Sequence, residues 1–209
     1  MNSEKSVRNM VMTAVMTAII IIMAFVPFLG YIPLGFMNAT IIHIPVIIGA
    51  IILGPKSGGF LGLVFGLTSL WKNTFMPNLT SFVFSPFIKI GDFGGNIWSL
   101  VICLVPRILI GIVAYYVYQL IMRMFKEGEK KQLTALVCAG VAGSLTNTLL
   151  VMNMIYLFFG SSYAIASNKA VEGFYAVILG VICTSGIPEA IVAGILTTAI
   201  ARVLLRVVK

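Results

Sequence analysis

The chain has 209 residues, of which 60% are hydrophobic and 10% are charged, and its mean hydropathy is +1.08. This composition excludes an ordinary water-soluble domain and indicates a protein that crosses the membrane several times. The formal net charge of +8 does not indicate nucleic-acid binding, because the basic residues form short clusters between long apolar runs.

Two uncharged runs indicate the number of crossings. Residues 9–55 and 132–168 contain no Asp, Glu, Lys or Arg, over 47 and 37 residues respectively. A helix that spans a bilayer needs about 20 apolar residues, so each run is longer than one crossing. The sequence therefore predicts an all-α integral membrane protein, with one domain over residues 1–209 and six transmembrane helices. These are expected at 9–28, 40–53, 57–71, 106–125, 133–158 and 187–207.

The basic clusters predict how the chain lies in the cell membrane. Ten of the 14 Lys and Arg residues fall beside the ends of helices that would lie inside, if both termini are cytoplasmic. Cytoplasmic loops carry such an excess of positive charge. The first apolar run also follows a basic start, like a signal peptide, but it is too long for one, and we expect it to be retained as a helix.

The first helix carries a small-residue face. Ala14 and Ala18 lie one turn apart in its inner half, where small side chains let another helix approach closely. Two interpretations stay open at this point. The face packs within the chain, or it docks another membrane subunit.

The second helix follows a polar outer turn that includes Asn38. At 40–53 it is short for a crossing, so it is expected to tilt or to lie where the bilayer is thinned. His43 lies near its outer end, and an interhelical hydrogen bond is the expected role. The sequence has no second histidine, so a histidine metal site is unsupported, and we expect no metal and no cofactor.

The third helix carries glycines at every fourth position, Gly58, Gly62 and Gly66, which predicts a close approach to another helix. It ends near Trp71. The outer segment that follows, 73–97, contains five phenylalanines. Loops of this length are functional or disordered. The aromatic residues argue against disorder and indicate a segment that packs over another part of the protein.

Arg107 is the only charged residue between positions 93 and 122. An ionisable residue at membrane depth is costly and marks a functional site. If a helix begins at Pro106, Arg107 lies in its first, outer turn, where a cation opposes the helix dipole. This position indicates an anionic partner, because a guanidinium can hold a carboxylate through two hydrogen bonds.

The last third of the chain allows two structures. Residues 171–184 are apolar but few, and Pro188 and Glu189 suit the first turn of a helix. We therefore favour a last helix from Ile187 and an outer segment before it. The alternative is one long helix that kinks at Pro188. In either case Glu189 lies near the outer end of the bundle. Two partners for Arg107 remain open, an internal carboxylate (Glu189 or Asp92) or a ligand.

Asn147 lies in the outer half of the fifth helix, where an amide needs a polar partner from a neighbouring helix or from a ligand.

The three cysteines are expected to be small buried hydrophobes, with a contact between Cys103 and Cys183 as the alternative. Residues 49–57 nearly match a phosphate-binding loop, but Pro55 breaks its spacing. No catalytic motif was found, so an intramembrane enzyme that uses Arg107 and Glu189 is disfavoured.

These motifs together resemble a known family. The chain carries Ala14-x-x-x-Ala18, Pro106-Arg107-x-x-x-Gly111, Asn147-Thr148 and the run 186–190 (GIPEA). They resemble the substrate-binding S components of energy-coupling factor (ECF) transporters. The resemblance implies that the chain binds a vitamin at the outer face and topples in the membrane to release it inside. It also implies that Ala14 and Ala18 contact a transmembrane coupling protein, and that two ATPase subunits supply the energy.

Within this family, residues 40–47 and 104–111 are most similar to the pantothenate-specific members. The resemblance implies that Arg107 binds the carboxylate of pantothenate, and that Asn147, with Asn38 or His43, binds its amide and hydroxyl groups. Glu189 and Trp71 complete the candidate substrate-binding residues. Folate would explain the arginine equally well, and riboflavin less well. A stand-alone secondary transporter is another class, but no internal repeat is evident, and only Glu189 could carry a coupling proton.

Overall fold

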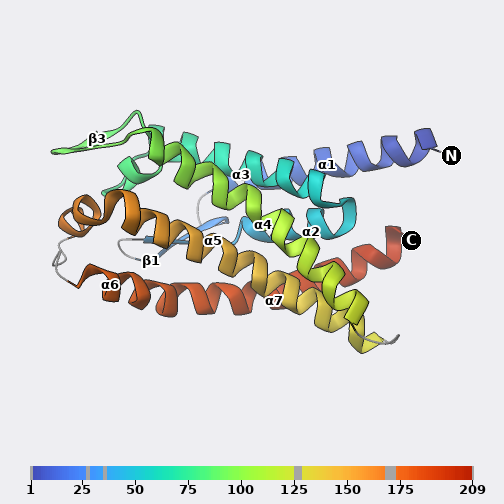
Figure 1. The fold of residues 1–209 in the computed structure, drawn as a ribbon. Helices are drawn as coiled ribbons and strands as arrows, with labels where there is room; N and C mark the ends of the chain where they lie inside the picture. The colour runs from blue at the N-terminus through green and yellow to red at the C-terminus, as the bar shows by residue number, and fades with distance from the viewer. Residues whose placement is uncertain (1, 27–28, 35–36, 125–128, 168–172, 209) are drawn as a thin grey trace.

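The computed structural model describes residues 2–26, 29–34, 37–124, 129–167 and 173–208. Helices run side by side along the length of the molecule, and two β-hairpins lie at one end (Figure 1). The helices are α1 (Asn2–Phe25), α2 (His43–Leu53), α3 (Pro55–Phe75), α4 (Ile97–Met124), α5 (Glu129–Ala166), α6 (Phe174–Val181) and α7 (Ile187–Val208). The hairpins pair β1 (Tyr31–Leu34) with β2 (Met37–Thr40), and β3 (Lys89–Ile90) with β4 (Phe93–Gly94).

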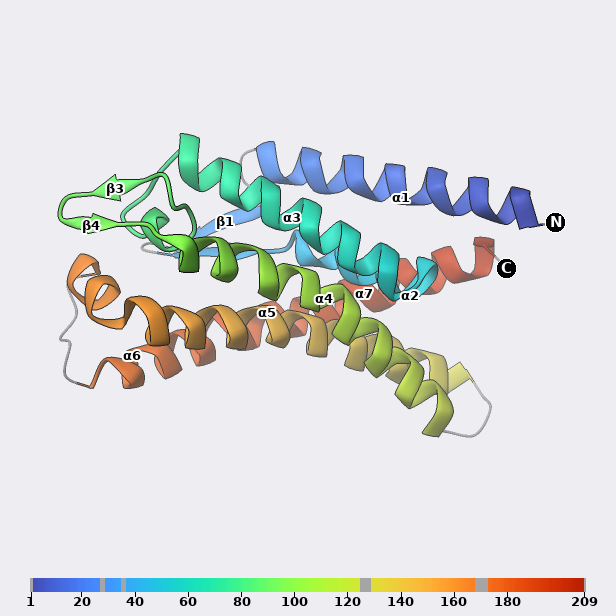
Figure 2. The same ribbon diagram turned by 45° about the horizontal axis from the view of Figure 1, so that its top comes forward.

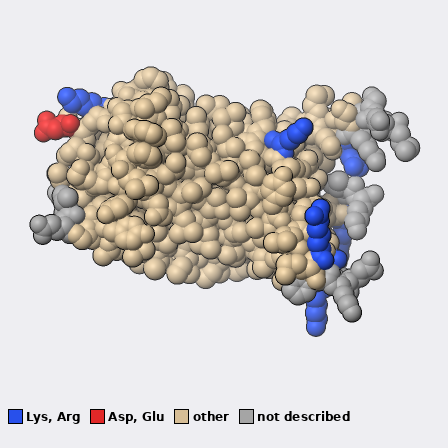
Figure 3. Space-filling view, in the orientation of Figure 1, with Lys and Arg blue, Asp and Glu red and all other residues tan. Residues whose placement is uncertain are grey.

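The helices have the lengths of a multi-pass membrane protein. In the described part of the chain, four stretches are long and apolar enough to cross a bilayer: Ser6–Phe25, Ile97–Met124, Lys130–Ala166 and Phe174–Val207. Helix α2 has only 11 residues, a length of about 16 Å, and it continues into α3 after Gly54. Charged side chains gather at the two ends of the molecule, and the visible face between them is almost free of charge (Figure 3).

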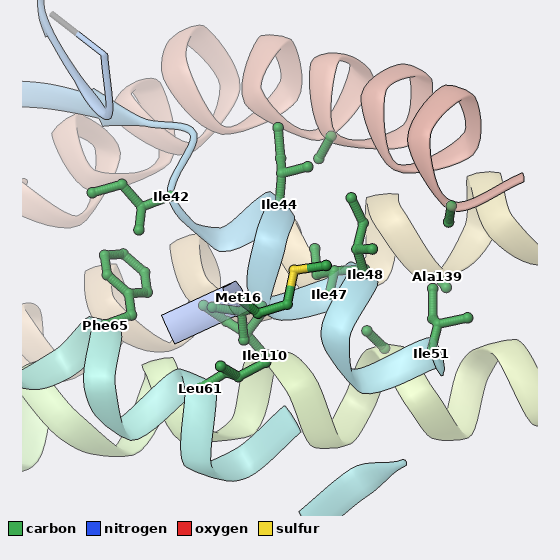
Figure 4. Close-up of a cluster of buried hydrophobic side chains, with 14 of the residues drawn as sticks. Met16, Ile42, Ile44, Ile47, Ile48, Ile51, Leu61, Phe65, Ile110 and Ala139 are labelled. Atoms are coloured by element: carbon green, nitrogen blue, oxygen red, sulfur yellow. The ribbon is translucent and has the colours of Figure 1, made fainter. Parts of the chain in front are cut away.

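Helix α2 is short because it lies inside the protein. Every residue from 42 to 51 is buried, and α1, α3, α4, α5 and α7 surround it. Its Ile47 and Ile48 belong to a core cluster with Met16 of α1 and Leu61 and Phe65 of α3 (Figure 4). A helix that is apolar on all sides suits such a buried position. Because other helices surround it, α2 does not have to be long enough to span the bilayer.

The predicted glycine face of α3 is confirmed. A Cβ on Gly62 would collide with the backbone carbonyl of Arg107, and one on Gly58 would lie 3.3 Å from the carbonyl carbon of Gly111. Gly66 also lies against the backbone of α4, since a Cβ on it would lie 3.1 Å from the Cys103 carbonyl oxygen. The backbones of α3 and α4 therefore touch along three turns, and this contact fixes the height and rotation of Arg107.

Helix α4 begins nine residues earlier than the sequence predicts, at Ile97 instead of Pro106. The reason is a reciprocal cap, in which the Asn96 side chain accepts the Trp98 N–H (2.9 Å) and the Asn96 N–H donates to Ser99 Oγ (3.1 Å). Pro106 therefore lies inside the helix. Arg107 lies about three turns below the start of α4, not in its first turn.

The last third also differs from the favoured prediction. Residues 174–208 form one continuous helical rod, in which a π-helical turn, Ile182–Gly186, joins α6 to α7. The predicted outer segment 171–184 is helical from Phe174 onward, and its first residues lie outside the described ones. The single long helix was the correct alternative. A wider turn interrupts it just before Pro188, because proline denies its neighbours the regular bond pattern.

The outer segment between α3 and α4 is a packed cover, as predicted. Its 3₁₀ turn, Ser81–Val83, is completely buried, and the Phe82 ring packs against Phe93 and Phe159 with centroids 5.8 Å apart in both pairs. The Ser99 hydroxyl donates to the Phe82 carbonyl at 2.7 Å. The segment is thus tied to α4 and α5 and closes one end of the bundle.

The cysteines only partly match their prediction. Cys103 is buried and its thiol donates to the Gly66 carbonyl at 3.3 Å, whereas Cys183 is exposed. Cys138 is half-buried. All three are free, so the alternative Cys103–Cys183 contact does not form a bond.

Candidate functional site

A cavity lies beneath the outer cover. This cover closes the end of the bundle opposite the two termini (Figures 1 and 2). Water centres can occupy about 100 Å³ of the cavity. This volume is several times the minimum that a cavity needs to hold one water, which is about 10–15 Å³. Polar side chains dominate the lining, which comprises Thr40, Ser69, Asn73, Asn78, Thr80, Phe84, Arg107, Asn147, Thr148, Val151, Met152, Tyr163, Val181, Ser185 and Glu189.

Arg107 brings a charge into this cavity although its side chain is only 6% exposed. Its Nη1 donates to the backbone carbonyl of Ile102 at 2.8 Å. The guanidinium carbon lies 5.7 Å from the ring centroid of Phe65 and 5.2 Å from that of Phe84. Aromatic faces attract a cation at such distances. The arginine is therefore held by neutral groups from α3, α4 and the outer cover.

Arg107 forms no direct ion pair among the described residues, although the Glu189 carboxylate in the same cavity acts on it electrostatically. Arg107 pairs directly with neither Glu189 nor Asp92, and its buried Nε has no hydrogen-bond partner. A buried donor of this kind is costly if it stays unpaired. The cavity therefore presents a donor that an anion could satisfy.

Glu189 lines the same cavity from the first turn of α7. One oxygen of its carboxylate accepts the backbone N–H of Thr40 at 2.8 Å. Thr40 is the last residue of β2, so this bond fastens the first hairpin to the last helix. Glu189 thus shapes the wall of the cavity through a backbone contact that joins residues 149 positions apart.

Asn147 reaches the cavity from α5. It is 6% exposed, and its Oδ1 has no partner among the described residues. Thr148 lies beside it in the lining, and its hydroxyl donates to the Ser144 carbonyl at 3.4 Å. An unpaired amide oxygen in a buried wall is an acceptor available to a donor on a ligand, such as a hydroxyl or an amide N–H.

The outer rim is a network of small polar side chains. Ser81 Oγ donates to Asn73 Oδ1 at 2.8 Å, and Asn73 Nδ2 donates to the Ser69 carbonyl at 2.8 Å. Thr80 Oγ1 donates to Asn78 Oδ1 at 3.1 Å. These bonds hold the outer cover on the end of α3, so the cavity has a polar roof as well as a charged wall.

The structure brings three of the predicted site residues together, Arg107, Asn147 and Glu189, because all three line the cavity. Trp71 does not line it. Its indole ring is 42% exposed and packs against Phe25 and Phe75 on the outside of the bundle. It lies near the end of α3, as predicted, but not on the face of the helix that lines the cavity.

His43 and Asn38 have different positions. His43 is buried beside the core cluster and does not line the cavity, and neither ring nitrogen has a hydrogen-bond partner among the described residues. The expected interhelical hydrogen bond is therefore not formed. Asn38 pairs with Pro33 in the first hairpin, but its side chain lies outside the described residues.

Sequence reasoning missed several lining residues, among them Thr40, Ser69, Asn73 and Thr148. Asn73 carried a signal, since it is an amide at the outer end of an apolar helix. Ser69 lies one turn before it on the same face. The small hydroxyl residues gave none, because serine and threonine also occur in membrane helices as simple packing residues. Among the described residues, no group of acidic, cysteine and histidine side chains could hold a metal ion.

Comparison with known proteins agrees with this architecture. Residues 8–201 match the family described as "ECF transporter, substrate-specific component". The pantothenic acid transporter PanT of Lactococcus lactis subsp. cremoris is 42% identical over 166 residues, 78% of this chain and 76% of that protein. The pantothenate transporter PanT of Leuconostoc mesenteroides subsp. mesenteroides is 29% identical over 211 residues, 97% of this chain and 94% of that protein.

A solved structure shares the fold. The S component for biotin from an ECF-type ABC transporter superposes with a TM-score of 0.51 at 16% identity, over 97% of this chain and 95% of that one. The match extends over nearly the whole chain, so it includes the rods α1 to α5 and the joined α6–α7. The match of residues 8–201, with the relative that is 42% identical, shows that this chain belongs to the family of substrate-specific S components of ECF transporters.

Proposed function

We propose that this S component captures pantothenate outside the cell and delivers it inward with an ATP-driven ECF module. The observation that carries the proposal is the buried Arg107, which lines the cavity, has an unpaired Nε and forms no ion pair within the described residues. A buried charge is stable only when it is paired. A ligand with a carboxylate would supply the missing partner.

The rest of the lining suits the other groups of pantothenate, which has an amide and two hydroxyls besides its carboxylate. Asn147 Oδ1 is an unpaired acceptor for a hydroxyl or an amide N–H. Ser69, Asn73 and Thr80 offer further polar atoms at the rim, and Val151 and Met152 an apolar wall for the methyl groups. In this pose the carboxylate binds Arg107 and the polar body lies along α5.

The size of the cavity and the relatives favour pantothenate over the other vitamins. The small cavity, about 100 Å³, suits a small molecule such as pantothenate better than the much larger folate. Riboflavin carries no carboxylate to pair with Arg107. Both relatives compared above are described as transporters of pantothenate or pantothenic acid.

The distribution of charge supports the orientation. Both termini lie at the same end of the bundle, where Lys and Arg side chains gather (Figures 1 and 3). Cytoplasmic ends carry this excess of positive charge. In this proposal the termini lie in the cytoplasm and the cavity lies towards the outside of the cell.

Helix α1 provides a surface for the coupling protein. It packs on the bundle through Met16, Ile20 and Ala24, which are buried at four-residue intervals. Ala14 and Ala18 are exposed on another face, where small side chains would allow the backbone of a partner helix to come close. ATP hydrolysis is assigned to two ATPase subunits of the module.

Reconstituted vesicles test this function. Vesicles that contain the chain together with an ECF module and internal ATP are expected to accumulate labelled pantothenate, and vesicles with the chain alone are expected not to. Uptake by the chain alone under a proton or sodium gradient would instead favour a stand-alone secondary transporter. Failure of the complete, ATP-loaded system to take up pantothenate would contradict the proposal.

A further inference from the structure

The proline that precedes Arg107 lies inside a membrane helix, and we propose that Pro106 positions the guanidinium for the carboxylate of the substrate. The inference rests on the proposed function, because it assumes that Arg107 binds this carboxylate. Pro106 is buried and does not line the cavity. It is therefore a positioning residue, which acts on the ligand only through Arg107.

The argument begins with the backbone of α4. In an α-helix, each N–H donates to the carbonyl four residues earlier, so residue 106 should donate to Ile102. Proline has no N–H, and the Ile102 carbonyl therefore lacks its helical donor. Ile102 is completely buried. Since a buried carbonyl needs a hydrogen-bond partner, the Ile102 oxygen must accept a hydrogen bond from a group other than residue 106.

Arg107 is that group. Its Nη1 lies 2.8 Å from the Ile102 oxygen. Side chains in a helix point back towards its N-terminus, and α4 begins at the end of the bundle where the outer cover lies (Figure 2). The arginine can therefore reach back along its own helix to the free carbonyl.

This arrangement orients the guanidinium without neutralising it. The three contacts that hold it, the Ile102 carbonyl and the rings of Phe65 and Phe84, are all uncharged. An internal carboxylate would compete with the substrate for the same charge. A hydrogen bond to an uncharged carbonyl instead fixes the direction of the guanidinium and leaves Nε unpaired. A side chain that is already ordered loses less entropy when the ligand binds.

Alanine at position 106 should release the arginine. Its N–H would donate to the Ile102 carbonyl, as in a regular helix, and would compete with Arg107 for this acceptor. The guanidinium could then turn towards Glu189, which lines the same cavity. Binding of a carboxylate would weaken, while binding of the uncharged part of the substrate would change little.

The test compares two ligands that differ only at this group, pantothenate and pantothenol, in which a hydroxymethyl replaces the carboxylate. Affinities of the purified full chain would be measured for the wild type, P106A, R107A and the double variant. We expect the wild type to prefer pantothenate by at least about tenfold. P106A should lose most of this preference and keep its affinity for pantothenol within roughly threefold. In the R107A background, P106A should have no further effect on the preference.

A backbone ester provides a matched control. The α-hydroxy-acid analogue of alanine at position 106 also lacks the N–H, so it should keep the wild-type preference although the proline ring is gone. Equal loss of affinity for both ligands in P106A would overturn the inference, and so would a P106A effect on the preference that persists without Arg107. If the wild type does not bind pantothenate, the proposed substrate fails, and this inference fails with it.

Discussion

In the proposed function, substrate recognition depends on Arg107. We predict that Arg107→Ala weakens pantothenate binding by about 10- to 100-fold, since a hydrogen bond to a charged group contributes about 1.5–3 kcal/mol. Arg107→Lys should restore only part of the affinity, because an ammonium group lacks the planar fork. Equilibrium binding to the purified chain would measure this. Arg123→Ala is the control, since Arg123 is exposed in the last turn of the same helix and should bind normally.

Glu189 has a structural role that a pair of substitutions can separate from its charge. Glu189→Ala leaves the Thr40 N–H without its acceptor, and an unpaired buried donor costs about 1–3 kcal/mol. Glu189→Gln keeps an acceptor oxygen at the same place. We therefore expect a clear fall in thermal stability for the alanine variant and a smaller one for glutamine. Equal destabilisation by both would show that the bond to Thr40 is not what matters.

Individual residues also show what the sequence can predict about the site. The rarity of polar groups in apolar helices pointed to Arg107, Asn147 and Glu189, and all three line one cavity. The sequence also placed Trp71 and His43 near the ends of their helices, but it did not predict the face of the helix on which each lies. Rotation about a helix axis depends on tertiary packing. A sequence that is apolar on every side carries no signal for it.

Contact between two elements, α3 and α4, sets the position of Arg107. We predict that Gly62→Ala lowers stability and weakens pantothenate binding, because the added methyl would collide with the Arg107 carbonyl. Gly59→Ala is a matched control on the same helix, since its methyl would meet the nearest side-chain atom at 3.7 Å, an ordinary contact. Alanine has the higher helix propensity, so Gly59→Ala should be neutral or stabilising. Thermal unfolding and ligand binding would be measured for both variants.

Helix boundaries were harder to predict than helices. The existence of α1 to α5 followed from the apolar runs, but the start of α4 was placed at Pro106 because proline is common in first turns. The reciprocal cap of Asn96 and Ser99 shows where the helix begins. Proline is tolerated in the interior of α4 because the Arg107 side chain donates to the Ile102 carbonyl, which lacks its helical donor. This compensation depends on side-chain geometry. The π turn before Pro188 is a similar case.

At the scale of the whole molecule, the proposed function separates two sites, a substrate cavity at one end and a docking surface along the side of α1. We predict that Ala14→Trp leaves pantothenate binding unchanged, since α1 contributes no residue to the cavity lining, and abolishes transport by blocking assembly with the coupling protein. Co-purification with the ECF module measures the assembly. Val15→Trp, at an exposed position that already carries a bulky side chain, is the control and should assemble. Normal assembly of the Ala14 variant would contradict the docking surface.

The overall architecture was the most predictable level. Composition and charge clusters indicated six helical rods with both termini at one end, and the bundle has this form (Figure 2). These features follow from burial in lipid, which constrains every residue of a crossing. The choice of ligand depends instead on a few contacts in the cavity, on which composition has no bearing.

The central claim is that this cavity binds pantothenate through Arg107. The most direct test is equilibrium binding of labelled pantothenate to the purified chain, without any ECF module, with riboflavin and folate as competitors. We predict saturable binding at a micromolar or lower dissociation constant, competition by unlabelled pantothenate, and little competition by the other two vitamins. No saturable binding of pantothenate in the micromolar range, or full displacement by riboflavin, would contradict it.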